Sequence, residues 1–563
     1  MNRNLLFSVI LFTISTFSGS AFSAPSEGQG IAYYRAGFPL VAKPLLIAEI
    51  ESNAASRGET CFNLGNIYFS ENQTDSAAYY FNKGLAADAT NSLNSIGLTM
   101  LKIKSDPTTA ETEFKNILKL KQNKKNLDIY LAIGNAYLFN GSLDNAVAYQ
   151  EKAKEIKTKD AEVYVLLGDI EFAKKNVGEA CKNYEQAIYF NDKCKEAYIK
   201  YARAYRIVNP NLAIEKLNTL KAIEPTFLLV DRELADIYYA TNDFKKAAEL
   251  YDNYLQSGNS NVQDLTKYAF TLFLGGDFAK SLEVTNLGLV KAVRNPVFNR
   301  LAMYNNVELT KTFTIQGNKD EAKKRNVEAL KAADLFFNHS DKPEFTFLDH
   351  RYYGQAFRDE DSISLAISEY DKALQLDSTK TDLWRDISDM YSKRRNYAKS
   401  IDAFAKYFSS LKDETKTYDI YSQYGKLYYG LGTADSTLTV AQKKSALIKA
   451  DSLFDIVATK EPANYLGNFW RARTNSALDP ETEQGLAKPY YEKTVEIVEA
   501  KKADVRYNSI LVESYSYLAY YYLVMKDNAT SLTFWTKILT LDPTNVNAKK
   551  AIDGIAKSAK AKK

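Results

Sequence analysis

Glycine and proline are scarce in this 563-residue sequence, which contains 24 and 12 of them. Because these residues dominate tight turns and interrupt helices, their scarcity, together with few alternating polar and apolar runs, predicts helix nearly throughout. Apolar material is not lacking, since 45% of the residues are hydrophobic and 40 are tyrosine. That composition excludes a largely disordered chain. We therefore expect an all-α protein with a packed interior.

Residues suited to catalysis or metal binding are also few. The two histidines of the sequence are His339 and His350, and neither has the spacing of metal ligands. Asp349 and His350 are neighbours, which directs them to different faces of a helix. The segment QGNKDEAKK at 316–324 lacks the spaced glycines and the Lys-Ser/Thr of a phosphate loop. The sequence predicts a protein that is not an enzyme and uses no cofactor and no metal ion.

An excess of one charge sign is missing as well. Lys and Arg number 73 against 69 Asp and Glu, a net charge of +4. This near balance argues against a nucleic-acid partner. The three cysteines, Cys61, Cys181 and Cys194, cannot all pair within one chain, and we expect them to be unpaired small core residues.

The longest apolar stretch lies at the start of the chain. Residues 1–23 combine Arg3, an apolar core from 5 to 17 and a small-residue cleavage site at 21–23, which predicts a secretory signal peptide. This core is too short to span a bilayer, and no later run reaches the roughly 20 residues required. No cysteine stands directly after the cleavage site, since the first is Cys61, so a lipoprotein is not expected. The prediction is an exported protein, periplasmic or secreted, with no transmembrane anchor after signal cleavage.

A spacing of small and aromatic residues recurs along the chain. Gly168 is followed by Ala180, Tyr184 and Ala187, at 12, 16 and 19 residues. Matching runs, with substitutions at single positions, begin at Gly65, Gly134, Ala235, Gly354, Ser388 and Ala519. The small residue lets a second helix cross close to the first, and the aromatic residue fills the gap beside it. We refer to these small residues as the repeat origins.

A 34-residue helix-turn-helix with this pattern resembles the tetratricopeptide repeat (TPR) family over nearly all of residues 29–543. The resemblance implies a superhelical solenoid of stacked hairpins, about 12 to 14 repeats long, with a concave binding surface. The expected organisation is an N-terminal superhelix over 24–338, a non-repetitive connector at 339–347 and a C-terminal superhelix over 348–543. A capping helix and a basic tail follow at 544–563. The chain is similar in particular to exported TPR proteins of Gram-negative bacteria that scaffold envelope complexes.

Helical geometry indicates which residues face the groove. Positions three before, one after and four after each origin share one face of the first helix. In the early repeats this face is apolar with a polar centre, and it supplies the candidate binding residues Phe62, Asn66, Asn135 and Asp169. An asparagine at the centre can hydrogen-bond a peptide backbone, which suits an extended or helical peptide. The alternative is that a tightly wound superhelix buries these residues itself.

The same face becomes basic further along. Its candidate residues form two sets: Arg203, Arg206 and Arg232, and then Arg351, Arg358 and Arg385. Because Arg351 and Arg385 occupy equivalent positions one repeat apart, they are expected to project side by side and to hold a carboxylate. The alternative is that acidic neighbours of the chain, such as Asp236 and Asp389, satisfy these arginines.

These observations favour a non-catalytic scaffold or adaptor of the bacterial cell envelope. Its partners would be proteins or peptides, bound in the concave groove. The alternative function is a module that binds envelope glycans or peptidoglycan, in which tyrosines stack on sugars and arginines contact carboxylates.

Overall fold

The computed structural model describes residues 28–52, 57–255, 261–501 and 505–561, and these form helices joined by turns, without a β-strand. The predicted signal segment 1–23 lies outside the described residues. The described part of the chain divides into two compact units between Pro343 and Glu344, inside the segment that the sequence suggested as a connector. In the described residues, no helix combines the length and the apolar character needed to cross a bilayer.

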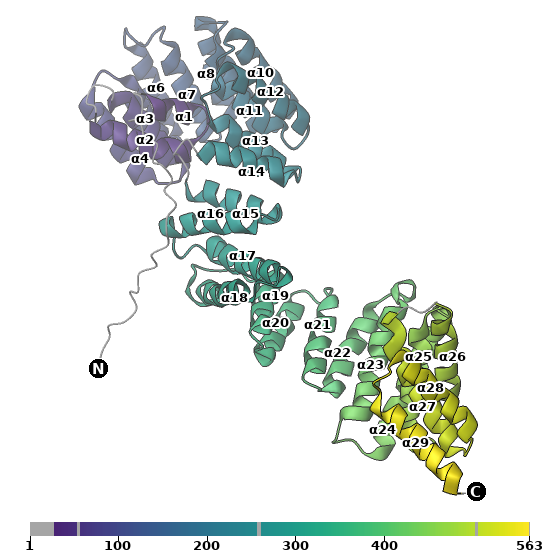
Figure 1. Cartoon of the computed structure of the whole chain (residues 1–563). Helices are drawn as coiled ribbons and strands as arrows, with labels where there is room; N and C mark the ends of the chain where they lie inside the picture. Colours follow the sequence, from purple (N-terminus) through teal and green to yellow (C-terminus); the bar gives the residue numbers. More distant parts are fainter. Residues whose placement is uncertain (1–27, 53–56, 256–260, 502–504, 562–563) are drawn as a thin grey trace, which may run out of the picture. The chain divides into compact units, whose positions relative to one another are not determined.

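The N-terminal unit is built from successive helical hairpins (Figure 1). Its helices are α1 (Gln29–Arg35), α2 (Pro39–Ser52), α3 (Arg57–Ser70), α4 (Thr74–Ala87), α5 (Ser92–Met100), α6 (Pro107–Lys119), α7 (Leu127–Phe139), α8 (Leu143–Ile156), α9 (Ala161–Ala173), α10 (Val177–Phe190), α11 (Lys195–Tyr205), α12 (Pro210–Ile223), α13 (Leu229–Ala240), α14 (Phe244–Leu255), α15 (Val262–Leu274), α16 (Phe278–Lys291), α17 (Pro296–Ile315) and α18 (Lys319–Asp334), followed by a π-helical turn (Leu335–His339).

The C-terminal unit continues the same hairpin arrangement. Its helices are α19 (Phe347–Asp359), α20 (Ile363–Leu376), α21 (Asp382–Lys393), α22 (Tyr397–Ser410), α23 (Tyr418–Ala434), α24 (Val440–Lys460), α25 (Tyr465–Leu478), α26 (Lys488–Glu499), α27 (Asn508–Val524), α28 (Asn528–Leu541) and α29 (Val546–Ala561). Short 3₁₀ turns cover Asp413–Thr415 and Val505–Tyr507.

Close packing of an origin against the aromatic residue 16 positions later joins the two helices of a repeat. A Cβ placed on Gly168 would lie 2.4 Å from Tyr184 Cε1, and one on Gly65 would lie 2.3 Å from Phe81 Cε1. Both aromatic rings are buried. Because real Cβ atoms do not approach so closely, only glycine admits the ring at these origins. The packing reason inferred from the spacing is confirmed.

Serines at the twelfth position add a hydrogen bond to this packing. Ser281 Oγ donates to the Ala269 carbonyl oxygen at 2.8 Å, and Ser531 Oγ donates to the Ala519 carbonyl oxygen at 2.8 Å. Both serines are buried. A buried hydroxyl is tolerated where it has such a partner, so serine replaces alanine here without an unsatisfied group.

The turn between the two helices of a repeat uses a left-handed residue seven positions after the origin. Lys175 follows Gly168 in this way with a φ of 64°, and Gly141 follows Gly134 with a φ of 78°. Asn72, Asn242, Gly276, Asp361, Arg395 and Lys526 hold the same place in other repeats. This position was not predicted from the sequence, because residues of several types occupy it.

Buried residues form clusters that each extend over several hairpins. One cluster runs from Ala77 to Ile170 and therefore links α4 to α9. A stack of this kind stabilises each hairpin through its neighbours rather than through a core of its own. All three cysteines are free thiols, and Cys61 and Cys181 are buried within the stack.

Candidate functional site

The first helices of successive repeats enclose a cavity of about 400 Å³ in the N-terminal unit. Its wall comes mainly from α1, α3, α5, α7, α9 and α11. Apolar side chains form much of the wall, among them Leu93, Ile96, Leu131 and Val165. We call this space the N-terminal cavity.

The four candidate residues of the early repeats all line the N-terminal cavity. Phe62 and Asn66 come from α3, Asn135 from α7 and Asp169 from α9. Their common placement follows from the repeat, since equivalent positions of stacked first helices point to the same side. The structure brings these four residues together on one wall. That they contact a ligand stays a prediction.

The hairpin of α1 and α2 closes one side of this cavity, although its partners lie far along the chain. Arg35 Nη2 is 3.0 Å from Glu59 Oε1, and Arg35 Nη1 is 3.3 Å from Glu162 Oε1. Arg203 Nη1 donates a 2.8 Å hydrogen bond to the Gly37 carbonyl oxygen. Phe38 and Val41 belong to the same buried cluster as residues of α11 to α17. The superhelical turn of this unit is thus closed on itself.

Carboxylates outnumber cations on the cavity wall. The acidic residues are Glu59, Asp128, Glu162, Asp169 and Glu196, and the basic residues are Arg35 and Lys200. Lys200 Nζ lies 2.6 Å from Glu196 Oε1 and also contacts Asp169. Partial burial raises the pKa of the Glu162 and Glu196 carboxyls. Burial alone would lower the pKa of Lys200, but Asp169 and Glu196 outweigh burial and raise it.

The polar residue that follows each origin has different surroundings in different repeats. The Tyr184 hydroxyl donates to Asp169 Oδ1 at 2.8 Å, and Tyr251 contacts Asp236 in the same way two hairpins further on. In the repeat that begins at Gly65, the aromatic residue is Phe81, which has no hydroxyl. Asn66 is only 5% exposed, and its Oδ1 has no hydrogen-bond partner in the described residues.

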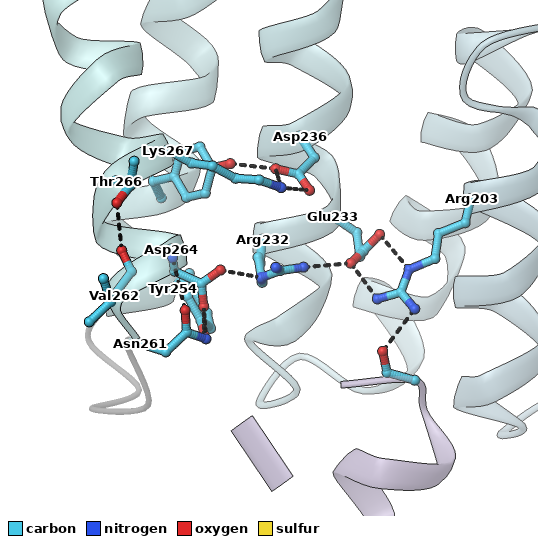
Figure 2. A network of polar contacts seen from close by, with 12 residues as sticks. Arg203, Arg232, Glu233, Asp236, Tyr254, Asn261, Val262, Asp264, Thr266 and Lys267 are labelled. Carbon is cyan, nitrogen blue, oxygen red and sulfur yellow. Dashed lines mark hydrogen bonds and ion pairs between the residues drawn. The ribbon is translucent and has the colours of Figure 1, made fainter. Parts of the chain in front are cut away.

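Arg203 and Arg232 hold carboxylates of the chain itself (Figure 2). Arg203 Nε and Nη2 donate to the two oxygens of Glu233 at 3.0 and 2.7 Å. Arg232 Nη1 also donates to Glu233, at 3.0 Å, and Arg232 Nε donates to Asp264 Oδ1 at 2.7 Å. Both acidic side chains are almost completely buried. These two arginines therefore form an internal clasp, because their donors are directed at buried acids rather than outward.

The acidic partners differ from those that the sequence suggested. Asp236, named there as a neighbour that could satisfy the arginines, contacts Lys267 Nζ at 2.7 Å instead (Figure 2). Arg206 is exposed and makes no ion pair in the described residues. It lines a second cavity of about 770 Å³ together with Ile207, Tyr239 and Phe270.

The second set of arginines surrounds Asp386 in the C-terminal unit. Arg358 Nη1 is 3.9 Å from Asp386 Oδ1, and burial raises the pKa of this carboxyl against the opposing effect of Arg358 and Arg351. Arg385 lies over the ring of Tyr407 at 6.0 Å. Within the described part of this unit, neither Arg351 nor Arg385 forms an ion pair within 4 Å, but both act electrostatically on Asp386, and Arg385 also acts on Asp389. That these arginines hold a carboxylate of a ligand stays a prediction.

Asp349 and His350 play separate roles, as expected for neighbours on a helix. Asp349 and Thr346 form a capping box at the start of α19. His350 Nδ1 lies 2.6 Å from Glu369 Oε2 on α20, and Lys372 Nζ lies 2.7 Å from Glu369 Oε1. Burial opposes the charged form of Glu369, but its hydrogen bonds with His350 and Lys372 prevail and lower its pKa. The pairing of His350 with Glu369 was not predicted, because their interval of 19 residues depends on how the two helices meet.

A family model described as tetratricopeptide repeat matches residues 58–91, 127–160 and 161–194. These segments contain the origins Gly65, Gly134 and Gly168. A search of curated protein sequences gives no significant match.

Solved structures similar to this chain include three bacterial or pilus-related examples. The C-terminal part of a TPR repeat-containing protein from Cytophaga hutchinsonii is 29% identical, with a TM-score of 0.40, over 51% of this chain and 99% of that chain. PilW, a type IV pilus biogenesis factor, is 18% identical, with a TM-score of 0.29, over 34% and 90% of the two chains. A tetratricopeptide repeat protein from Parabacteroides merdae is 11% identical, with a TM-score of 0.27, over 54% and 100%.

The three matched segments fold as helical hairpins, and the same spacing of origin and aromatic residue continues beyond them in both units. The chain therefore contains tetratricopeptide repeats at residues 58–91, 127–160 and 161–194.

Proposed function

We propose that the protein is a non-catalytic scaffold or adaptor that binds a segment of a partner protein in the N-terminal cavity. The observation that carries this proposal is the cavity itself, whose wall is lined by residues from six helices of successive hairpins. A wall that repeats along its length suits a polymer ligand whose residues also repeat. Apolar wall residues such as Ile96 and Leu131 would contact side chains of the partner, and polar residues such as Asn135 would contact its backbone.

The proposed place of action is the bacterial cell envelope, in the periplasm. This part of the proposal is supported by the signal peptide predicted at residues 1–23. Fractionation of cells that produce the full chain, with determination of the N-terminal residue of the mature protein, tests it. An uncleaved cytoplasmic product would contradict it.

A second candidate function is supported by the C-terminal unit. Arg351 and Arg385 form no ion pair within 4 Å in the described residues, and their guanidinium donors suit a carboxylate ligand that joins them near Asp386. Such a carboxylate could belong to an acidic protein segment or to an envelope glycan such as a peptidoglycan stem. Binding to isolated peptidoglycan that is lost in the Arg351→Ala/Arg385→Ala double variant would favour the glycan.

Affinity capture from an envelope extract, compared between matched variants, tests the primary proposal. Asn135→Trp places a large side chain in the N-terminal cavity without changing the buried core, because Asn135 is half-buried on the wall. Tyr79→Trp places the same side chain at a position that is 59% exposed on α4. We expect specific proteins to be captured by the wild type and by Tyr79→Trp but not by Asn135→Trp. Equal capture by all three would contradict the proposed site.

A further inference from the structure

The N-terminal cavity concentrates negative charge in a chain whose overall charge is positive. Five carboxylates and two cations line it, whereas the whole chain has a net charge of +4. The excess of negative charge is therefore local to this cavity. Clefts that gather one sign of charge between apolar walls attract ligands of the opposite sign.

Each of the two cations is already shared between two carboxylates. Arg35 contacts Glu59 and Glu162, and Lys200 contacts Asp169 and Glu196. Asp128 makes no ion pair in the described residues. The chain's own side chains thus leave the carboxylates of this wall incompletely neutralised, and an additional cation would stabilise their charged forms.

An acceptor without a donor lies on the same wall. Asn66 Oδ1 is buried without a hydrogen bond because Phe81 stands where Tyr184 and Tyr251 serve the later repeats. Asn66 lies near the Tyr34 hydroxyl, and Tyr34 in turn lies within the electrostatic reach of Glu196 and Lys200. Buried acceptors in folded proteins are normally paired, so an N–H donor from a ligand would complete this one.

We propose that the N-terminal cavity binds a lysine or arginine side chain on an apolar segment of a partner protein, beside the wall residues Asp128, Glu162, Glu196 and Asn66. This inference rests on the proposed function and specifies its ligand. Apolar residues such as Ile96 and Val165 suit the methylene stem of the basic side chain and its apolar neighbours. A free polyamine has the charge but lacks the apolar neighbours.

Fluorescence anisotropy with the full chain and a matched panel of peptides tests the inference. The panel consists of short leucine- and valine-containing peptides that differ in one central residue, which is Lys, Arg, Gln or Glu. We expect the Lys and Arg peptides to bind about tenfold tighter than the Gln peptide, and this preference to weaken as salt is added. If the Gln and Glu peptides bind as tightly as the Lys peptide, the inference is wrong and the proposed function stands. If no peptide binds, both fail.

Two variants of equal charge assign the effect to the cavity. Asp128→Asn removes an unpaired carboxylate from the wall, and Asp144→Asn removes an exposed carboxylate from α8, outside the cavity. We expect Asp128→Asn alone to weaken binding of the Lys peptide, by about threefold or more. If both variants weaken binding equally, the preference for the Lys peptide comes from the net charge of the chain and not from the cavity, and the inference is wrong. Spermidine that binds as tightly as the Lys peptide would also overturn it, in favour of a polyamine ligand.

Discussion

Arg203 and Gly37 are joined by a 2.8 Å hydrogen bond across 166 residues of sequence. This bond fixes the first hairpin of the chain against α11, and the ion pairs of Arg35 fix it against α3 and α9. The contact converts a curved stack of repeats into a closed turn with a cavity inside. The N-terminal cavity thus depends on a long-range contact as well as on the repeats themselves.

Replacement of Gly37 tests this closure. Gly37 has a φ of 83°, and a Cβ there would lie 2.6 Å from Arg203 Nη1. We expect Gly37→Ala to reduce the free energy of unfolding of this unit by about 2 kcal/mol, through backbone strain and loss of the Arg203 contact. The control is Gly141→Ala, which has a φ of 78° but no atom within 4 Å of the added Cβ, and it should cost only about 1 kcal/mol. Hydrogen exchange in α1 and α11 measures the loss of stability in each of the two variants, and equal losses would contradict the closure.

Two helical glycines distinguish origin packing from helix propensity. Gly168→Ala gains helix propensity but brings a Cβ to 2.4 Å from Tyr184, so we expect a net loss of stability of about 2 kcal/mol. Gly178→Ala on α10 has no atom within 4 Å and should raise stability by about 0.5 to 1 kcal/mol. Urea unfolding curves of the two variants should shift in opposite directions. A shift in the same direction would show that the ring does not require the glycine.

Asn66 is expected to contribute to binding rather than to folding. Asn66→Leu removes a buried acceptor that has no partner, so stability should be unchanged or higher by about 1 kcal/mol, whereas binding of the Lys peptide should weaken several-fold. The control is Asn94→Leu, because Asn94 Nδ2 donates a 2.8 Å hydrogen bond to the Gly58 carbonyl oxygen. This variant should lose about 1 to 3 kcal/mol of stability. Thermal unfolding of both variants, with peptide titrations, separates the two roles.

The contact between His350 and Glu369 predicts a dependence of stability on pH. The pKa of Glu369 is lowered below its ordinary value of 4.5, so its contribution to stability is present above that pH and is lost as pH falls through the lowered value. We expect Glu369→Gln to destabilise the C-terminal unit at neutral pH, and this effect to fade progressively as the pH falls below 4.5. Hydrogen exchange in α19 and α20 as a function of pH measures this. Glu483→Gln, at an exposed glutamate, serves as the control, and a difference that persists in acid would contradict the assignment.

The contacts within a repeat could be predicted from the sequence, whereas the closure could not. Gly168 and Tyr184 belong to one hairpin, so their spacing alone places them together. The wall residues Asn66 and Asn135 could be predicted as well, because equivalent positions of stacked helices share one side. The bond between Arg203 and Gly37 depends on small rotations that add up over several repeats, and no local spacing encodes their sum.

The partners of the arginines show the same limit. The sequence places acids near Arg232 at several positions, among them Asp236 and Asp264. In the structure Arg232 pairs with Asp264, while Asp236 contacts Lys267 and Tyr251. These acids lie on different sides of their helices, so the angle between neighbouring hairpins decides which acid an arginine meets. The sign of the charges alone could therefore not show whether these arginines bind acids of the chain or a ligand.

Photo-crosslinking from the cavity wall tests the central claim most directly. A photoreactive amino acid replaces Asn135, which lines the N-terminal cavity, or Tyr79, which is exposed on α4. The account predicts that only the probe at position 135 crosslinks a protein of the envelope extract, and that the Lys peptide, but not the Gln peptide, competes with this product. Crosslinks that form equally from position 79, or that the Lys peptide does not reduce, would contradict it.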